Sequence, residues 1–125
     1  VRATVERVVD GDTLEVRAQI WLGQEVRVLA RVAGVDTPEL AGDCRLERAL
    51  AAQARDFVQR FASSGAVILR DIKQDKYGGR VVALVSDVQN RDLSGALIEA
   101  GLARRYAGGK RGGWCVAQSL LETPP

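Results

Sequence analysis

Three short segments combine side chains that can bind a cation and a phosphate group. They are Asp10 to Thr13 (DGDT), Arg31 to Glu39 (RVAGVDTPE) and Asp75 to Arg80 (DKYGGR). Each puts carboxylates or a guanidinium beside turn-forming residues, and turns on a rigid scaffold are where binding and catalytic groups concentrate. Together they supply hard oxygen ligands, a further carboxylate for acid–base work and arginines for phosphate. This combination predicts hydrolysis of phosphodiester bonds.

The carboxylates of the first two segments predict a cation site. Asp12 follows a glycine and shares the parity of apolar Leu14, so its carboxylate points inward if the strand extends that far. Asp36 ends a predicted strand and can face Asp12. Two aspartates with a backbone carbonyl and water form a roomy oxygen-only site, which suits calcium better than magnesium. Glu39 remains available to orient or deprotonate a water.

Two arginines complete the predicted site. Arg31 and Arg80 carry planar guanidinium groups that grip phosphate bidentately and stay charged at every relevant pH. Together they can neutralise the charge that builds on a phosphate under attack. Taken singly, each feature also has a structural interpretation: a turn, a strand end before a proline, or a surface arginine.

The composition excludes several kinds of chemistry. The chain has 125 residues and a net charge of +2, and it contains no His, which excludes histidine-based acid–base catalysis and the commonest zinc ligand. No apolar run approaches the roughly 20 residues that span a bilayer. One basic cluster, formed by Arg104, Arg105, Lys110 and Arg111 around Tyr106, suits a phosphate backbone and a stacked base. A solvated basic loop explains that cluster equally well.

Hydrophobic periodicity predicts strands first and helices later. Apolar residues at alternate positions predict strands, with a hairpin turn at Gly23-Gln24, and apolar residues at three- and four-residue spacing predict helices. The expected strands are 5–9, 13–22, 26–32, 66–72 and 80–86, and the expected helices are 45–62, 94–100 and a short one near 114–122. This order predicts an α+β fold, a small five-stranded Greek-key barrel with two to three attached helices.

The three segments, in this order and at these separations, closely resemble the staphylococcal nuclease (thermonuclease) family. The resemblance runs from about Val5 to Tyr106 and includes Ala96 to Ala103 (ALIEAGLA). Members are calcium-dependent nucleases on an OB-fold barrel with three helices. The resemblance implies that residues 1–125 form one thermonuclease-like (SNase-like) domain with an OB-fold. It further implies an endonuclease that hydrolyses DNA, RNA or both with little sequence preference.

The resemblance also implies roles for the acidic segments. Asp12 and Asp36 would bind Ca²⁺ through their carboxylates and Thr37 through its carbonyl, while Glu39 would act as general base or position the water. Attack by water would cleave the 5′ P–O bond and leave a 3′-phosphate.

The remaining motif residues would contact the substrate. Arg31 and Arg80 would bind the scissile phosphate, and Lys76 and Tyr77 would flank a terminal phosphate. Tyr106 stands near the place where the family prototype has two tyrosines. The turn before Arg80 has one glycine more than the Tyr-Gly-Arg of the prototype.

Cysteine usage and the start of the chain bear on the compartment. The chain begins at Val1 and contains no Met, which indicates a processed or trimmed segment from which a signal peptide could have been removed. In an exported monomeric nuclease of this size, Cys44 and Cys115 would pair; two buried thiols are the alternative. A catalytically weak nucleic-acid-binding module and a protein-interaction domain remain alternative functions.

Overall fold

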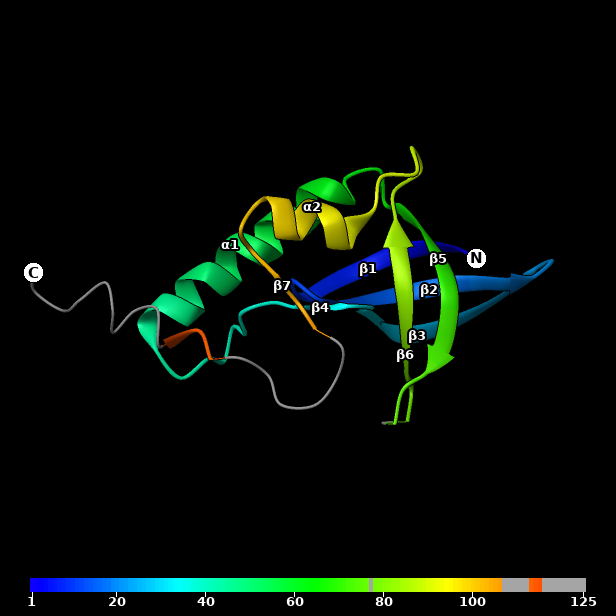
Figure 1. Cartoon of the computed structure of the whole chain (residues 1–125). Coiled ribbons are helices and arrows are strands. Elements are labelled where there is room, and N and C mark those ends of the chain that lie inside the picture. The colour runs from blue at the N-terminus through cyan, green and yellow to red at the C-terminus, as the bar shows by residue number, and fades with distance from the viewer. Residues whose placement is uncertain (77, 107–112, 116–125) are drawn as a thin grey trace, which may run out of the picture.

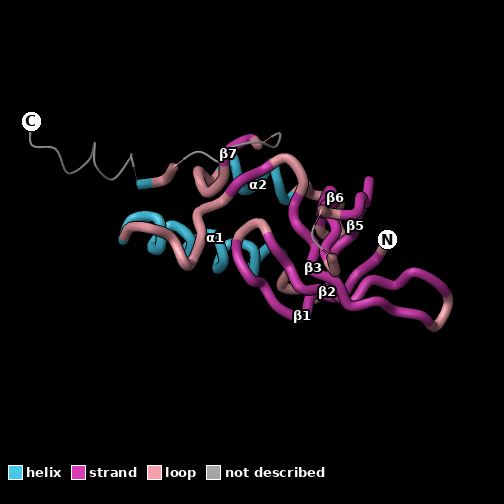
Figure 2. Tube along the Cα trace, turned by 90° about the horizontal axis from the view of Figure 1, so that it is seen from below, coloured by secondary structure: helices cyan, strands magenta, loops and turns pink. Residues whose placement is uncertain are grey.

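The described part of the chain forms a closed five-stranded barrel with two helices at one end (Figure 1). The computed structural model describes residues 1–76, 78–106 and 113–115. The barrel strands are β1 (Arg2–Asp10), β2 (Thr13–Trp21), β3 (Gln24–Val32), β5 (Ala66–Gln74) and β6 (Arg80–Ser86). Figures 1 and 2 both place the helices α1 (Arg45–Phe61) and α2 (Leu93–Glu99) at one end of the barrel and the tip of the β2–β3 hairpin at the other. The predicted α+β barrel is therefore confirmed.

The strands join in the order β1-β2-β3-β6-β5, and β5 closes the barrel on β1. All neighbouring pairs are antiparallel except β3 with β6, which is parallel. The alternation seen in the sequence corresponds to burial, because the even-numbered Leu14, Val16 and Ala18 of β2 are buried. Strand β1 begins at Arg2 rather than at the expected Val5. Strand β5 ends at Gln74 rather than at the expected Ile72, because Lys73 and Gln74 are polar and give no alternation signal.

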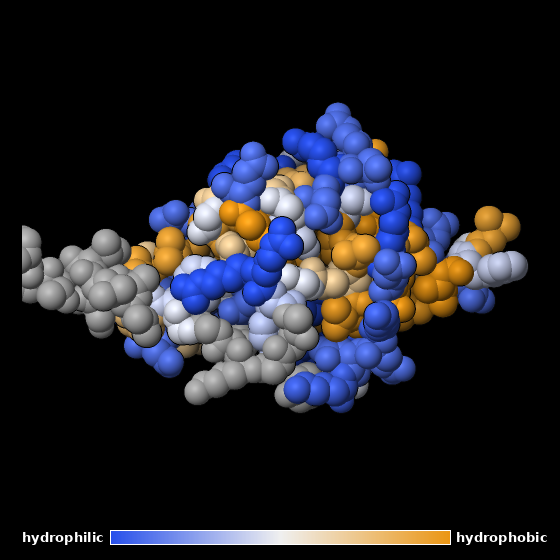
Figure 3. Space-filling model, in the orientation of Figure 1, coloured by the Kyte–Doolittle hydropathy of each residue, from blue (hydrophilic) through white to orange (hydrophobic). Residues whose placement is uncertain are grey.

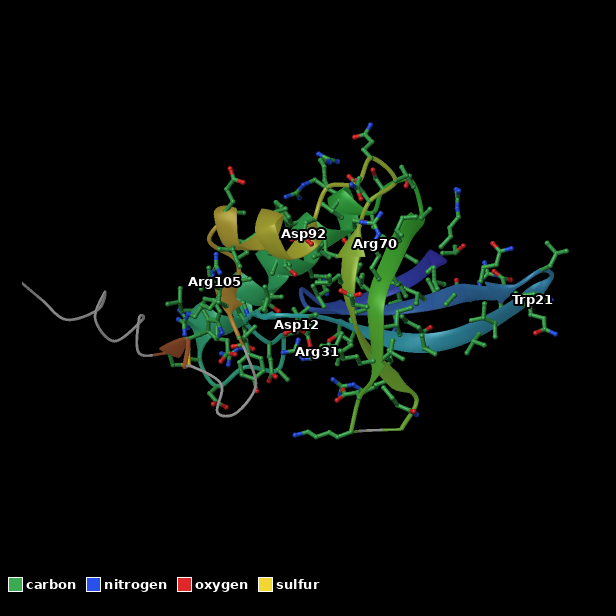
Figure 4. The ribbon with its side chains drawn as sticks, turned by 45° about the vertical axis from the view of Figure 1, so that its right-hand side comes forward. Asp12, Trp21, Arg31, Arg70, Asp92 and Arg105 are labelled. Carbon is green, nitrogen blue, oxygen red and sulfur yellow. A yellow bond between two sulfur atoms is a disulfide. The ribbon has the colours of Figure 1, made fainter. Side chains whose placement is uncertain are left out.

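The outer end of the β2–β3 hairpin differs from the expectation. Alternation predicted that Ile20, Leu22 and Val26 lie on the inner face, but their exposed fractions are 54%, 88% and 39%, and that of Trp21 is 72%. The hairpin extends past its neighbours: β1 pairs with β2 no further than Ala18, and β6 pairs with β3 only from Leu29. Figure 3 shows apolar surface at this tip, and Figure 4 shows Trp21 at the far end of the hairpin.

Both helices start and end close to the expected residues. Helix α1 buries Ala51, Ala54 and Val58 and ends one residue before the expected Ala62. Helix α2 begins earlier than expected because the side chain of Asp92 accepts a hydrogen bond from the main-chain N–H of Gly95 (2.9 Å) and caps the helix. The expected helix at 114–122 lies outside the described residues except at its first two positions. Within the described segments, no helix has the length and apolar content to cross a bilayer.

A small second sheet joins two distant parts of the chain. Strand β4 (Val35–Asp36) pairs antiparallel with β7 (Arg104–Arg105), and the N–H of Tyr106 donates to the carbonyl of Gly34 (2.9 Å). Strands of two residues are too short to show periodicity, so the sequence did not predict this sheet. It brings Tyr106 beside the segment that carries Asp36.

Candidate active site at the helix end of the barrel

Asp12 contacts two other residues of the predicted site, Arg31 and Thr37. It lies in the turn between β1 and β2 and is buried. Its Oδ2 accepts from the main-chain N–H of Thr37 (3.3 Å) and forms an ion pair with Arg31 Nη1 (3.2 Å), while its Oδ1 accepts from the hydroxyl of Thr13 (3.0 Å). The carboxylate therefore links the first two sequence segments directly.

Asp36 ends β4, and the next residue, Thr37, contacts Asp12 through its main-chain N–H. Asp36 and Thr37 are both buried, with exposed fractions of 2% and 0%. The turn at Gly11 packs closely here: a Cβ added to Gly11 would lie 2.7 Å from the Cβ of Ala54 and 3.1 Å from Oγ1 of Thr37. Glycine at this position therefore allows the carboxylate-bearing turn, helix α1 and Thr37 to meet without a side chain between them.

Arg31 is far less exposed than its position in the pattern suggests. It lies on the odd face of β3, away from the apolar stripe, yet only 16% of its side chain is exposed. Its Nη2 donates to the carbonyl of Val35 (3.1 Å), and its guanidinium carbon lies 5.6 Å from the centre of the Tyr106 ring. The ion pair with Asp12 completes this environment, and Figure 4 shows the two side chains close together.

Arg80 emerges on the same face of the barrel as Arg31. In the parallel pairing of β3 and β6, Arg80 is the register partner of Leu29, which lies two residues before Arg31. Strand spacing and rise then put the two arginine Cα atoms roughly 8 Å apart, within reach of one phosphate for two long side chains. Arg80 Nε forms an ion pair with Asp75 Oδ2 (3.2 Å), and the N–H of Asp75 donates to the carbonyl of Arg80 (3.1 Å).

The main chain at Glu39 is bound by two carboxylates from different elements. The N–H of Glu39 donates to Glu47 Oε2 in α1 (3.1 Å), and the N–H of Leu40 donates to Asp10 Oδ1 at the end of β1 (3.1 Å). Glu39 itself is half-buried. The loop that carries the candidate base is thus attached to both the barrel and the helix.

The structure describes only part of the predicted substrate-binding set. Lys76 is exposed at the β5–β6 turn, whereas Tyr77 lies outside the described residues, as do Lys110 and Arg111 of the basic cluster. Arg104 Nη1 donates to the carbonyl of Gly113 (2.8 Å), and its guanidinium carbon lies 3.8 Å from the ring centre of Trp114. Arg104 therefore packs on the C-terminal segment, whereas Arg31 lies over the ring of Tyr106.

Cys44 and Cys115 form a disulfide with a Cα–Cα distance of 5.8 Å. Cys44 is the residue before α1, and 71 positions separate the two cysteines. The bond attaches the segment around Trp114 to the start of the helix, next to Glu47, whose Oε1 lies 3.8 Å from the Sγ of Cys115.

The donor set of Asp12, Asp36 and Thr37 fits a hard cation. Its groups are carboxylate and carbonyl oxygens, and the hydrogen bond from the N–H of Thr37 joins the segment of Asp36 and Thr37 to Asp12. The described part of the chain contains no group of three or more His, Cys, Asp or Glu side chains that could hold a metal ion. Any ion here would therefore keep carbonyl and water ligands besides the two carboxylates, which is ordinary for calcium.

Comparison with known proteins decides the family. A family profile described as "Staphylococcal nuclease homologue" matches residues 29–113, more than half of the chain. The chain belongs to the staphylococcal nuclease family. It is also 31% identical, over 136 residues, to a protein of Saprolegnia parasitica (strain CBS 223.65) named "Endonuclease Htp3". That alignment covers 98% of this chain and 62% of the relative.

Within this family frame, sequence reasoning missed the residues that support the site. Asp10 accepts from the N–H of Leu40, Glu47 accepts from the N–H of Glu39, and Asp75 forms an ion pair with Arg80. The sequence held one usable signal: Glu47 is the third residue of a helix, where a glutamate commonly accepts from the main-chain N–H of the cap residue.

Proposed function

We propose that this member of the staphylococcal nuclease family hydrolyses phosphodiester bonds of DNA, RNA or both, with a calcium ion as cofactor. The main observation in support of this proposal is the set of contacts made by the Asp12 carboxylate. This buried carboxylate meets the amide of Thr37 and the guanidinium of Arg31, beside the second buried aspartate, Asp36. A cation site next to a phosphate-binding side chain is the arrangement that phosphodiester hydrolysis requires.

Asp12, Asp36 and the carbonyl of Thr37 would hold the ion. When bound, calcium supplies positive charge that stabilises the developing charge on a phosphoryl oxygen. Burial of the two aspartates supports this role, since buried carboxylates are retained where they bind a partner charge or hydrogen-bond donors.

Glu39 is proposed as the general base. Its carboxylate takes a proton from a water, the water oxygen bonds to phosphorus, and the P–O bond to the 5′ oxygen breaks. The 5′ oxygen takes a proton from solvent and leaves as a hydroxyl, and a 3′-phosphate remains. A base must keep a defined position relative to that water, and the attachment of the Glu39 and Leu40 amides to two carboxylates supports this.

Arg31 and Arg80 are proposed to bind the phosphate under attack. They share one face of the β3–β6 pair, and a guanidinium has five N–H donors, more than Arg31 uses on Asp12 and Val35. Phosphate groups are the same at every nucleotide, so recognition through them predicts little sequence preference.

The direct test incubates the protein with single-stranded and duplex DNA and RNA, with calcium, with magnesium or with chelator. We expect hydrolysis with calcium, little with magnesium, and none in chelator, because magnesium demands a stricter octahedron than two carboxylates and a carbonyl provide. Full activity in chelator would refute metal dependence.

A matched variant tests the role of Glu39. Glu39→Gln should lower kcat by about 10²–10⁴-fold while calcium and nucleotide binding persist. Binding without hydrolysis in the wild-type protein would favour the nucleic-acid-binding alternative, and neither binding nor hydrolysis would favour a protein-interaction domain.

The disulfide supports a proposed location. Structural disulfides persist in oxidising compartments and are rare in the cytosol. We therefore also propose that the protein acts after export, and two reactive thiols in protein isolated from its native cells without reductant would contradict this.

A further inference from the structure

One side chain closes the loop that follows the candidate cation site. Glu47 Oε2 accepts from the main-chain N–H of Glu39 (3.1 Å), and Glu47 Oε1 accepts from the N–H of Asp43 (3.3 Å). A single carboxylate thus binds both ends of the segment 39–43. Within that segment, the N–H of Gly42 donates to the carbonyl of Glu39 (2.9 Å).

This use of a helix-start glutamate is unusual. Glu47 is the third residue of α1, where a glutamate normally accepts from the amide of the cap residue, here Cys44. It instead accepts from residues upstream of the cap. The first-turn position still places its carboxylate at the positive end of the helix dipole.

The loop fits closely onto this carboxylate. Glu47 is 9% exposed, and a Cβ added to Gly42 would lie 2.4 Å from its Cδ and 2.7 Å from its Oε1. Burial of a charged group costs free energy unless its hydrogen bonds are made, so the two amide bonds are required by the position. The disulfide sulfur of Cys115, 3.8 Å from Oε1, covers the same carboxylate.

We propose that Glu47 is a positioning residue for Glu39, and this rests on the proposed role of Glu39 as general base. Glu47 binds the amide of Glu39, while Asp10 binds the next amide, at Leu40. These bonds come from a helix and a strand, so they determine where the Glu39 backbone lies relative to the barrel. Without Glu47, the main-chain N–H of Glu39 loses this acceptor, and the Glu39 side chain samples more positions.

The test is Glu47→Gln, which preserves size but offers one acceptor oxygen to two amide donors. Misplacement of a reacting group by about 1 Å can cost about 100-fold in rate. We expect kcat to fall about 10- to 100-fold with KM within about 3-fold of wild type. Glu99→Gln, at an exposed position in α2, is the matched control and should leave both constants unchanged.

A double-mutant cycle separates positioning from a merely structural role. If Glu47 acts through Glu39, Glu47→Gln should cost less than about 3-fold when added to Glu39→Gln, because effects of residues that act as a unit are not additive. A merely structural role would lower kcat by the same factor in both backgrounds, and that result would overturn the proposal.

Amide hydrogen exchange gives a readout that does not depend on activity. In Glu47→Gln the amides of Glu39 and Asp43 should exchange faster, while amides in the barrel strands exchange as in wild type. Unchanged protection at Glu39 would overturn the proposal even if the wild-type protein proved inactive. Inactive wild-type protein with faster exchange at Glu39 in the variant would refute the proposed function and leave the positioning contact in place. Gly42→Ala perturbs the same contact from the loop side and should reproduce the faster exchange.

Discussion

Arg31→Lys tests the site most sharply because the substitution keeps the charge and removes the geometry. The guanidinium reaches Asp12 Oδ2 (3.2 Å) and the carbonyl of Val35 (3.1 Å) with different nitrogens. A lysine has one nitrogen on a flexible stem and can make one of these contacts well. We expect it to keep the ion pair with Asp12 and to lose both the bond to Val35 and the fork that binds phosphate.

In Arg31→Lys, the expected loss of stability is too small to explain the expected loss of catalytic rate. A hydrogen bond from a charged donor contributes about 1.5–3 kcal/mol, so the free energy of unfolding should fall by about 2 kcal/mol and Tm by roughly 5–10 °C. Since domains are stable by about 5–15 kcal/mol, more than about 99% of the variant remains folded at 25 °C. Loss of a donor aimed at developing charge lowers kcat by about 10²–10³-fold. Unfolding therefore cannot account for the expected loss of activity.

The assay compares turnover at saturating calcium, nucleotide affinity and thermal unfolding for each variant. Arg27→Lys is the control, because Arg27 lies on the same strand and with the same parity but is exposed near the hairpin tip. It should change none of the three. Turnover of Arg31→Lys within a few-fold of wild type would refute the assignment of Arg31 to the phosphate.

Two further predictions concern the support of the site and the pH dependence of folding. Gly11→Ala should lower the free energy of unfolding by about 1–3 kcal/mol, because its Cβ would lie 2.7 Å from that of Ala54. Adding Ala54→Gly should recover part of this loss. Strictly additive effects of the two substitutions in chemical denaturation would contradict this prediction. Burial alone raises the pKa of Asp87, but hydrogen bonds from Arg91 and Gln89 outweigh it and lower the pKa from 3.8. Because the folded-state pKa is the lower one, the stabilisation is present above about pH 4 and is lost as pH falls through that pKa. The stability difference between wild type and Asp87→Asn should therefore shrink as pH falls below about 4.

The barrel could be predicted because its strands carry a strong local signal. The alternation from Leu14 to Ala18 and the helical spacing up to Val58 both record burial on one face, and burial is what forms these elements. The same signal misled at Leu22, because alternation shows which face is apolar but not where the neighbouring strands end. Partner strands are a long-range property that no local pattern contains.

The residues of the candidate site, too, could be predicted from the sequence only in part. Side chains that belong to a motif, such as Asp12 and Arg31, could be named from their types and turns, and the structure brings these two together. The residues that support them could not. Glu47 binds an amide eight positions upstream, and Asp10 binds one thirty positions downstream. Both contacts depend on how α1 packs on the barrel.

The charges at this end of the barrel support the proposed cation site. Asp10 and Glu47 bind main-chain amides, and Asp12 binds one amide and one cation, Arg31. Amides orient carboxylates but carry no net charge, so these contacts leave negative charge that a bound cation would neutralise. Calcium binding to the folded state must then stabilise it, by about 2.7 kcal/mol at a calcium concentration 100 times the Kd. Thermal unfolding should shift upward with calcium in wild type and much less in Asp36→Asn; equal shifts in both would mean that the ion binds elsewhere.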